Sequence, residues 1–112
     1  MKIYHNPRCS KSRQGLAIVK EADEDLEIRE YLKEPVSVEE LTDIIRKLDI
    51  PALELVRKNE KDWKENFKNK NLSEQEVIEA MVSFPKLIER PIVVKGERAV
   101  IGRPPEKIRD LL

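Results

Sequence analysis

The first 32 residues follow a pattern that strongly restricts the fold. Residues 2–5 predict a short buried strand closed by Asn6-Pro7, residues 10–22 a helix, and residues 26–32 a second strand. Two successive strands joined through a helix form a parallel pair with a right-handed crossover. The chain therefore opens on a βαβ unit, and later strands have to extend the sheet that this unit begins.

The middle of the chain, about residues 37–84, has helical periodicity instead. Ser37 with Glu40, and Ser73 with Glu76, have the spacing of a capping box at the start of a helix. Apolar residues follow both pairs at intervals of three and four, as on one helical face. We therefore predict a helical insertion over this range.

Within the insertion, the sequence also predicts a further helix and a pair of aromatic side chains in the core. Pro51 suits the first position of another helix, which would run through Leu53 and Val56. Trp63 and Phe67 are four residues apart, so they lie on one face of a helix. We expect both rings to belong to the core rather than to form a binding platform.

Strand character returns near the end of the chain. Residues 92–94 and 99–101 are apolar and mostly β-branched, and residues 95–98 between them predict a turn. A final helix opens at 103–105. The order βαβ, helical block, ββα predicts an α/β fold, with a small mixed sheet and helices on both of its faces, in one domain over residues 1–112.

The cysteine and histidine content excludes several classes of protein. The chain has one cysteine, Cys9, and one histidine. An internal disulfide is therefore impossible, and so is a dithiol redox cycle completed within one chain. A structural zinc site of the usual Cys/His type is excluded as well, and we expect no bound metal.

Charge and hydropathy indicate the setting of the protein. Lysine plus arginine and aspartate plus glutamate both number 22, a balance that argues against nucleic-acid binding. No apolar run approaches a membrane span or a signal peptide. We expect a cytoplasmic protein, and we expect it to be a monomer.

Cys9 lies immediately before the predicted first helix. Unpaired N–H groups and the helix dipole favour negative charge there, and such a position lowers the pKa of a cysteine. The same helix end can hold a phosphate-like group. We therefore predict that Cys9 is a thiolate nucleophile with a lowered pKa.

The surroundings of Cys9 are basic and polar. His5 can add positive charge, and Ser10 and Ser12 can donate hydrogen bonds to a sulfur anion or to a bound oxyanion, which makes Ser12 a candidate substrate-binding residue. Residues 1–13 contain no acidic residue and four strongly basic ones, namely Lys2, Arg8, Lys11 and Arg13.

Four segments together resemble a known family. Residues 5–13, His-Asn-Pro-Arg-Cys-Ser-Lys-Ser-Arg, resemble the active-site segment of glutaredoxin-coupled arsenate reductases. Residues 88–94, 101–106 and 55–60 resemble further signatures of the same family. The resemblance covers essentially the whole chain and implies a thioredoxin-like fold with a helical insertion.

The resemblance also implies an activity and the residues that perform it. Cys9 would be the nucleophile, His5 would help to keep its thiolate charged, and Pro91 would be a cis-proline beside the active site. Arsenate would be the substrate in a detoxification reaction, glutathione a co-substrate, and glutaredoxin the recycling partner, with no bound cofactor.

Only this resemblance assigns three arginines to substrate binding, because their spacing does not distinguish them from the other basic residues. Arg57, Arg90 and Arg103 would bind arsenate and its reduced intermediate. Guanidinium groups match a tetrahedral oxyanion well, since each presents a fork of N–H donors.

Two other functions remain open at this point. The chain could be a glutathione-dependent thiol oxidoreductase of the same superfamily, which would use the same cysteine segment. It could also be a non-catalytic regulator that binds a protein partner such as RNA polymerase. Redox-sensing regulators of this superfamily carry Cys-x-x-Cys, whereas this chain has Ser12 at the fourth position.

Overall fold

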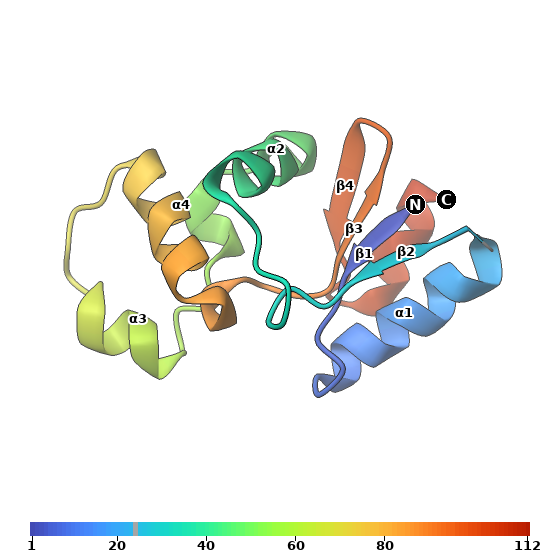
Figure 1. Cartoon of the computed structure of the whole chain (residues 1–112), viewed down its shortest axis with the longest axis horizontal. Coiled ribbons are helices and arrows are strands. Elements are labelled where there is room, and N and C mark those ends of the chain that lie inside the picture. Colours follow the sequence, from blue (N-terminus) through green and yellow to red (C-terminus); the bar gives the residue numbers. More distant parts are fainter. Residues whose placement is uncertain (24) are drawn as a thin grey trace. The chain divides into compact units, whose positions relative to one another are not determined.

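The computed structural model describes residues 1–23 and 25–112, which form two compact units (Figure 1). The sheet unit combines Met1–Glu34 with Arg90–Leu112, and the helical unit is Pro35–Glu89. No helix among the described residues is both long and apolar enough to cross a membrane.

The sheet unit has the predicted four-stranded mixed sheet, with the strand order β2-β1-β3-β4. Strand β1 is parallel to β2, with Ile3 opposite Ile28, and antiparallel to β3, with Ile3 opposite Val93. Strands β3 and β4 form the predicted hairpin, whose turn includes Gly96 with a φ of 60° that favours glycine. The elements of the unit are β1 (Lys2–Tyr4), α1 (Ser10–Ala22), β2 (Glu27–Arg29), β3 (Ile92–Lys95), β4 (Arg98–Ile101) and the 3₁₀ helix η3 (Pro105–Leu111).

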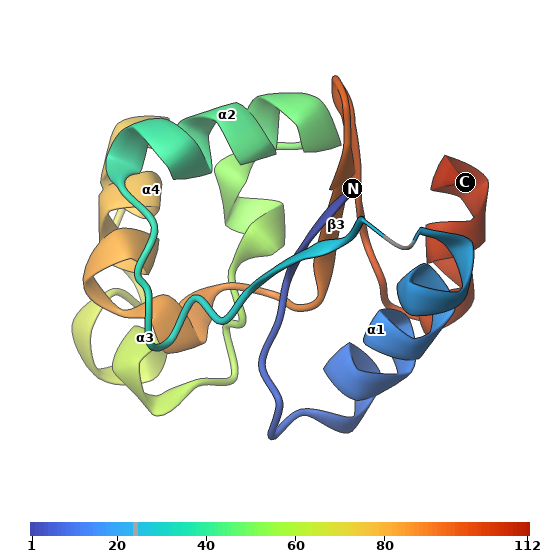
Figure 2. The same ribbon diagram turned by 45° about the vertical axis from the view of Figure 1, so that its right-hand side comes forward.

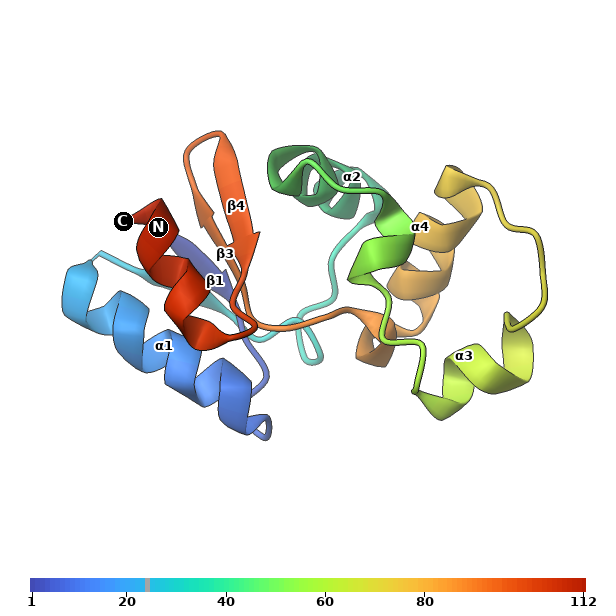
Figure 3. The same ribbon diagram turned by 180° about the vertical axis from the view of Figure 1, so that it is seen from behind.

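Helix α1 and η3 pack side by side against one face of the sheet (Figures 2 and 3). The apolar core between these elements and the sheet is almost inaccessible to water, since each central side chain is at most 3% exposed. Burial of one such side chain contributes about 1.5–3 kcal/mol. This packing fixes α1, whose first turn follows Cys9. The central residues are Ile3, Val19, Val93, Ile108 and Leu111.

Helices α2 and α4 begin at the predicted cap residues, and the predicted capping box is complete at the second of them. Ser37 Oγ accepts a hydrogen bond from the Glu40 N–H at 3.1 Å. Ser73 and Glu76 form a complete capping box, with both reciprocal hydrogen bonds present. Helices α2 and α4 pack against each other. The elements of the unit are α2 (Val38–Leu48), η1 (Ala52–Leu55), α3 (Lys61–Asn66), α4 (Glu74–Ser83) and η2 (Pro85–Leu87).

Some predicted elements differ in length or type. The second strand comprises only Glu27–Arg29 of the predicted 26–32. The helix predicted from Pro51 through Val56 is a single 3₁₀ turn, because Val56 is extended and forms an antiparallel bridge with Ile88. The last helix is also 3₁₀.

The aromatic pair of α3 only partly matches the expectation of a core. Trp63 is buried, at 9% exposure, whereas Phe67 is half-buried. Their ring centroids are 5.4 Å apart, and Phe67 also meets Phe84 edge to face. The pair therefore anchors α3 and leaves one ring partly accessible.

Candidate active site

Cys9 is the N-cap residue of α1, with an extended backbone at φ −96° and ψ 123°. Its N–H donates to the Asn6 carbonyl, and its carbonyl accepts from the Arg13 N–H, both at 3.0 Å. The Asn6 side-chain oxygen accepts from the Arg8 N–H at 3.0 Å. The loop is thereby held from both sides, and it presents a half-buried thiol at the start of a helix.

Asn6 is a site residue that the sequence analysis did not single out. Its side chain is 6% exposed, and its backbone N–H donates to Ser12 Oγ at 3.0 Å. It thus connects the end of β1 with the first turn of α1. In the sequence the Asn6-Pro7 pair indicates only the end of a strand, although asparagine in turns often bonds the backbone two residues further along, as Asn6 does with Arg8.

The thiol of Cys9 has a lowered pKa, as predicted. Burial by itself would raise the pKa of Cys9, but the backbone N–H of Ser12 outweighs it together with the Arg90 guanidinium and the backbone N–H of Lys11. Arg90 acts both as a hydrogen-bond donor and as a positive charge. These contributions are the helix-start effect and an opposite charge, which favour the anion.

Arg90 and Arg103 lie together in the sheet unit. Arg103 Nη1 donates to the Arg90 carbonyl at 3.2 Å. Arg90 Nε is buried and has no hydrogen-bond partner among the described residues. The Arg90 guanidinium therefore acts on the Cys9 thiol, and the Arg103 guanidinium contacts the main chain of Arg90.

Pro91 has the cis peptide bond that the sequence analysis predicts for it, and the Arg103–Pro104 bond is cis as well, which the sequence did not indicate. Two glycines leave room for the Pro91 ring. A Cβ atom added at Gly15 would lie 2.8 Å from Pro91 Cγ, and one added at Gly102 would lie 2.9 Å from the same atom. Both distances are below ordinary van der Waals contact, so these positions are glycine because of close approach.

Burial works against the positive charge expected on His5. It is the largest influence on the imidazole, and it lowers the pKa of His5 from its ordinary value. His5 Nδ1 lies 2.7 Å from Ser12 Oγ, and both side chains are buried. His5 therefore contacts the side chain of the residue whose backbone N–H favours the Cys9 thiolate.

Ser12 also differs from its predicted role. Its side chain is 0% exposed, and its hydroxyl is engaged with His5 and with the Asn6 N–H. The hydroxyl faces the interior, whereas its backbone N–H serves Cys9. What Ser12 contributes to the site is thus a main-chain donor.

Arg57 belongs to the helical unit, where it forms ion pairs with Glu60 at 3.1 Å and with Glu89 at 3.5 Å. Its backbone N–H donates to the Leu87 carbonyl at 2.7 Å. Two carboxylates thus hold a guanidinium that the resemblance assigns to substrate binding. No group of three or more His, Cys, Asp or Glu side chains that could hold a metal ion occurs in residues 1–23 and 25–112.

The lowered pKa of Cys9 leads to a test by alkylation. We expect the rate of reaction with iodoacetamide to stay high well below pH 8.5, the region where an ordinary thiol of pKa about 8.5 loses its thiolate. Arg90→Gln removes a hydrogen bond and a positive charge, so the pKa should rise and the rate at pH 6.5 should fall several-fold.

Arg98→Gln is the matched control, because Arg98 is an exposed arginine of β4 that donates to the Asp110 carbonyl. Its alkylation profile should follow that of the unmodified protein. Thiolate absorbance at 240 nm gives an independent titration. A midpoint at or above that of a free cysteine would show that the thiol is inert.

Comparison with known proteins places these features in context. The model of the ArsC family matches residues 4–111. The uncharacterized protein YfgD of Escherichia coli (strain K12) is 46% identical over 100% of this chain and 96% of its own length. Arsenate reductase of Haemophilus influenzae is 42% identical over 98% of this chain and 97% of its own. The solved structure described as arsenate reductase from Vibrio cholerae has a TM-score of 0.93 at 40% identity, over 100% of this chain and 98% of that one.

Proposed function

Because this chain belongs to the ArsC family, we propose that it reduces arsenate to arsenite, with the Cys9 thiolate as nucleophile. The thiolate attacks arsenic, a sulfur–arsenic bond forms, and one arsenate hydroxyl takes up a proton and leaves as water. Arg90 and Arg103 stabilise the negative charge on the remaining oxygens, together with N–H groups at the start of α1.

The two electrons come from two thiols. Glutathione attacks the adduct, and as a sulfur–sulfur bond with Cys9 forms, the electron pair of the sulfur–arsenic bond stays on arsenic. Arsenic passes from As(V) to As(III) and leaves as arsenite. A glutaredoxin thiol then attacks the mixed disulfide and frees the Cys9 thiolate, which fits a reaction in the reducing cytoplasm.

A hollow beside the Cys9 loop supports a small external thiol. It has a volume of about 240 Å³, and its lining includes Pro7, Arg8, Glu30, Leu32 and Lys33. Cationic and anionic side chains occur there together, which suits a peptide that carries an ammonium group and two carboxylates. Glutathione has this chemistry.

The observation that carries the proposal is a thiol of lowered pKa on which the Arg90 guanidinium acts both as a hydrogen-bond donor and as a positive charge. A cysteine that only fills space needs no guanidinium, whereas an arsenic oxyanion needs both a nucleophile and a cationic cradle. We assign Arg57 to the same substrate, as the family resemblance implies. A thiol oxidoreductase would need the thiolate but no site for a tetrahedral anion.

An arsenate-dependent turnover assay with glutathione and glutaredoxin tests this function. We expect arsenite to form catalytically and in proportion to the NADPH that glutathione reductase consumes. The same mixture with a model disulfide in place of arsenate should show only background consumption. Turnover of the disulfide without turnover of arsenate would favour the thiol oxidoreductase, and inactivity toward both would favour the regulator that binds a protein partner.

A further inference from the structure

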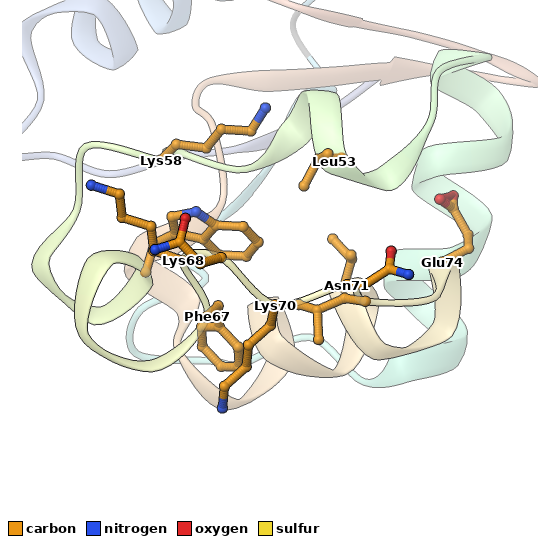
Figure 4. Close-up of a pocket in the computed structure, with 11 residues that line it drawn as sticks. Leu53, Lys58, Phe67, Lys68, Lys70, Asn71 and Glu74 are labelled. Atoms are coloured by element: carbon orange, nitrogen blue, oxygen red, sulfur yellow. The ribbon is translucent and has the colours of Figure 1, made fainter.

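A second hollow, in the helical unit, contains none of the residues placed at the Cys9 site. Its volume is about 370 Å³, which lies within the usual range of about 300–1,000 Å³ for small-molecule sites. It lies between the 3₁₀ turn η1, helix α3 and the start of α4, as the labelled side chains in Figure 4 show.

The interior of this hollow is apolar and partly aromatic. Trp63 and Phe67 both line it, with centroids 5.4 Å apart and planes inclined by 32°. Leu53, Leu72 and Val77 complete the apolar surface, and Leu53 is 41% exposed. Flat aromatic ligands suit such walls, because stacked or edge-to-face rings gain more than burial alone provides.

The rim of the hollow is cationic. Lys58, Lys68 and Lys70 border it, and Figure 4 shows their side chains on different sides of the opening. Within residues 1–23 and 25–112 none of these three lysines forms an ion pair, whereas Lys47 and Lys61 of the same unit pair with Asp43 and Glu65. The rim thus keeps three positive charges that no carboxylate neutralises.

The carboxylate that lines the hollow is already engaged. Both oxygens of Glu74 accept from the Ala52 N–H, at 3.1 and 2.9 Å. Glu74 therefore serves the start of η1 and is not free to bind a cationic ligand. Asn69 and Asn71 supply further polar groups at the opening.

We propose that this hollow binds an organic anion with a flat ring, its ring against Trp63 and Phe67 and its anionic group among Lys58, Lys68 and Lys70. An inorganic anion would leave the apolar walls unused, and a neutral ring would gain nothing from the three ammonium groups. The proposal is independent of the Cys9 chemistry.

The chain carries its own reporter for this site. Trp63 is the single tryptophan, so intrinsic tryptophan fluorescence originates at the hollow. The anionic ring compound 8-anilinonaphthalene-1-sulfonate absorbs where tryptophan emits, and N-phenyl-1-naphthylamine is the same molecule without the sulfonate. We expect the sulfonate to quench Trp63 by energy transfer, with one molecule bound per chain.

The decisive comparison is a charge variant. Combining Lys58→Gln, Lys68→Gln and Lys70→Gln should raise the dissociation constant of the sulfonate about five- to twentyfold, since each exposed charge contributes modestly. Binding of the uncharged analogue should stay within about twofold of the unmodified protein on the same physical grounds. In 1 M salt, interactions between exposed charges extend only about 3 Å. Such salt should weaken binding of the sulfonate and leave binding of the uncharged analogue unchanged.

Lys61→Gln combined with Lys64→Gln is the matched control. Both are exposed lysines of α3 that do not line the hollow, so this variant removes two positive charges outside the hollow, against three at its rim. Sulfonate binding in this variant should change by less than about twofold. Three results would each overturn the proposal: no quenching of Trp63 at saturation, equal weakening by the two sets of variants, or equal weakening of both compounds.

Discussion

Replacing Cys9 by serine is expected to abolish arsenate reduction, with a loss on the order of a thousandfold or more in turnover. The reaction needs a nucleophile that is an anion at neutral pH. Backbone N–H groups of Ser12 and Lys11 and the Arg90 guanidinium keep the Cys9 pKa low, and a serine hydroxyl in the same place stays protonated. It also cannot form the sulfur–sulfur bond that transfers the electrons.

Arsenite formed per minute, measured by chromatography with arsenic detection, gives the readout. The variant should unfold at the same temperature as the unmodified protein, because serine keeps the size of the half-buried side chain. Arg98→Gln again serves as an active control. Arsenite formation by Cys9→Ser at more than about one-tenth of the unmodified rate would contradict the mechanism.

Local rules made the positions of several elements predictable. The capping pair of Ser73 and Glu76 fixed the start of α4, because its two hydrogen bonds involve residues only three apart. The βαβ opening likewise predicted the parallel pairing of β1 and β2 and the location of Cys9 at the start of α1. In these places short-range chemistry and the final fold require the same arrangement.

Long-range contacts decided what the sequence did not reveal. The helix expected after Pro51 stops after one turn because Val56 pairs with Ile88, more than thirty residues later in the chain. The protonation of His5 depends on burial, which no spacing encodes, and burial lowers the pKa of its imidazole. Arg90 reaches Cys9 across most of the sequence, so only the family resemblance could select it.

For Ser12 the sequence predicts the position in the helix correctly, but the structure differs from the predicted role of its hydroxyl, which points inward. The sequence predicts that a serine three residues after the nucleophile binds the substrate. Helical geometry instead turns its side chain toward His5 and leaves its N–H at the thiol. The residue at this position decides the redox chemistry as well, since a cysteine there could have formed a disulfide with Cys9.

A second large effect concerns the electron donor. Cys9 is the single cysteine of the chain, so after the first sulfur–arsenic bond no thiol within the protein can complete a disulfide. Thioredoxin and its reductase reduce disulfides formed within a protein, and this chain can form none. We expect negligible steady-state reduction with that pair alone, and restoration by more than tenfold when glutathione and a glutaredoxin are added, a difference typical of a missing co-substrate.

The two donor systems should be compared at equal NADPH and equal arsenate, with arsenite as the readout. A Ser12→Cys variant is an informative companion, because it places a second thiol one helical turn after Cys9. That thiol would replace the buried hydroxyl that contacts His5, so its melting temperature has to be measured alongside. Full activity of the unmodified protein with thioredoxin alone would refute the requirement for an external small thiol. Activity with another small thiol in place of glutathione would preserve it, since the requirement follows from the number of cysteines and not from the identity of the donor.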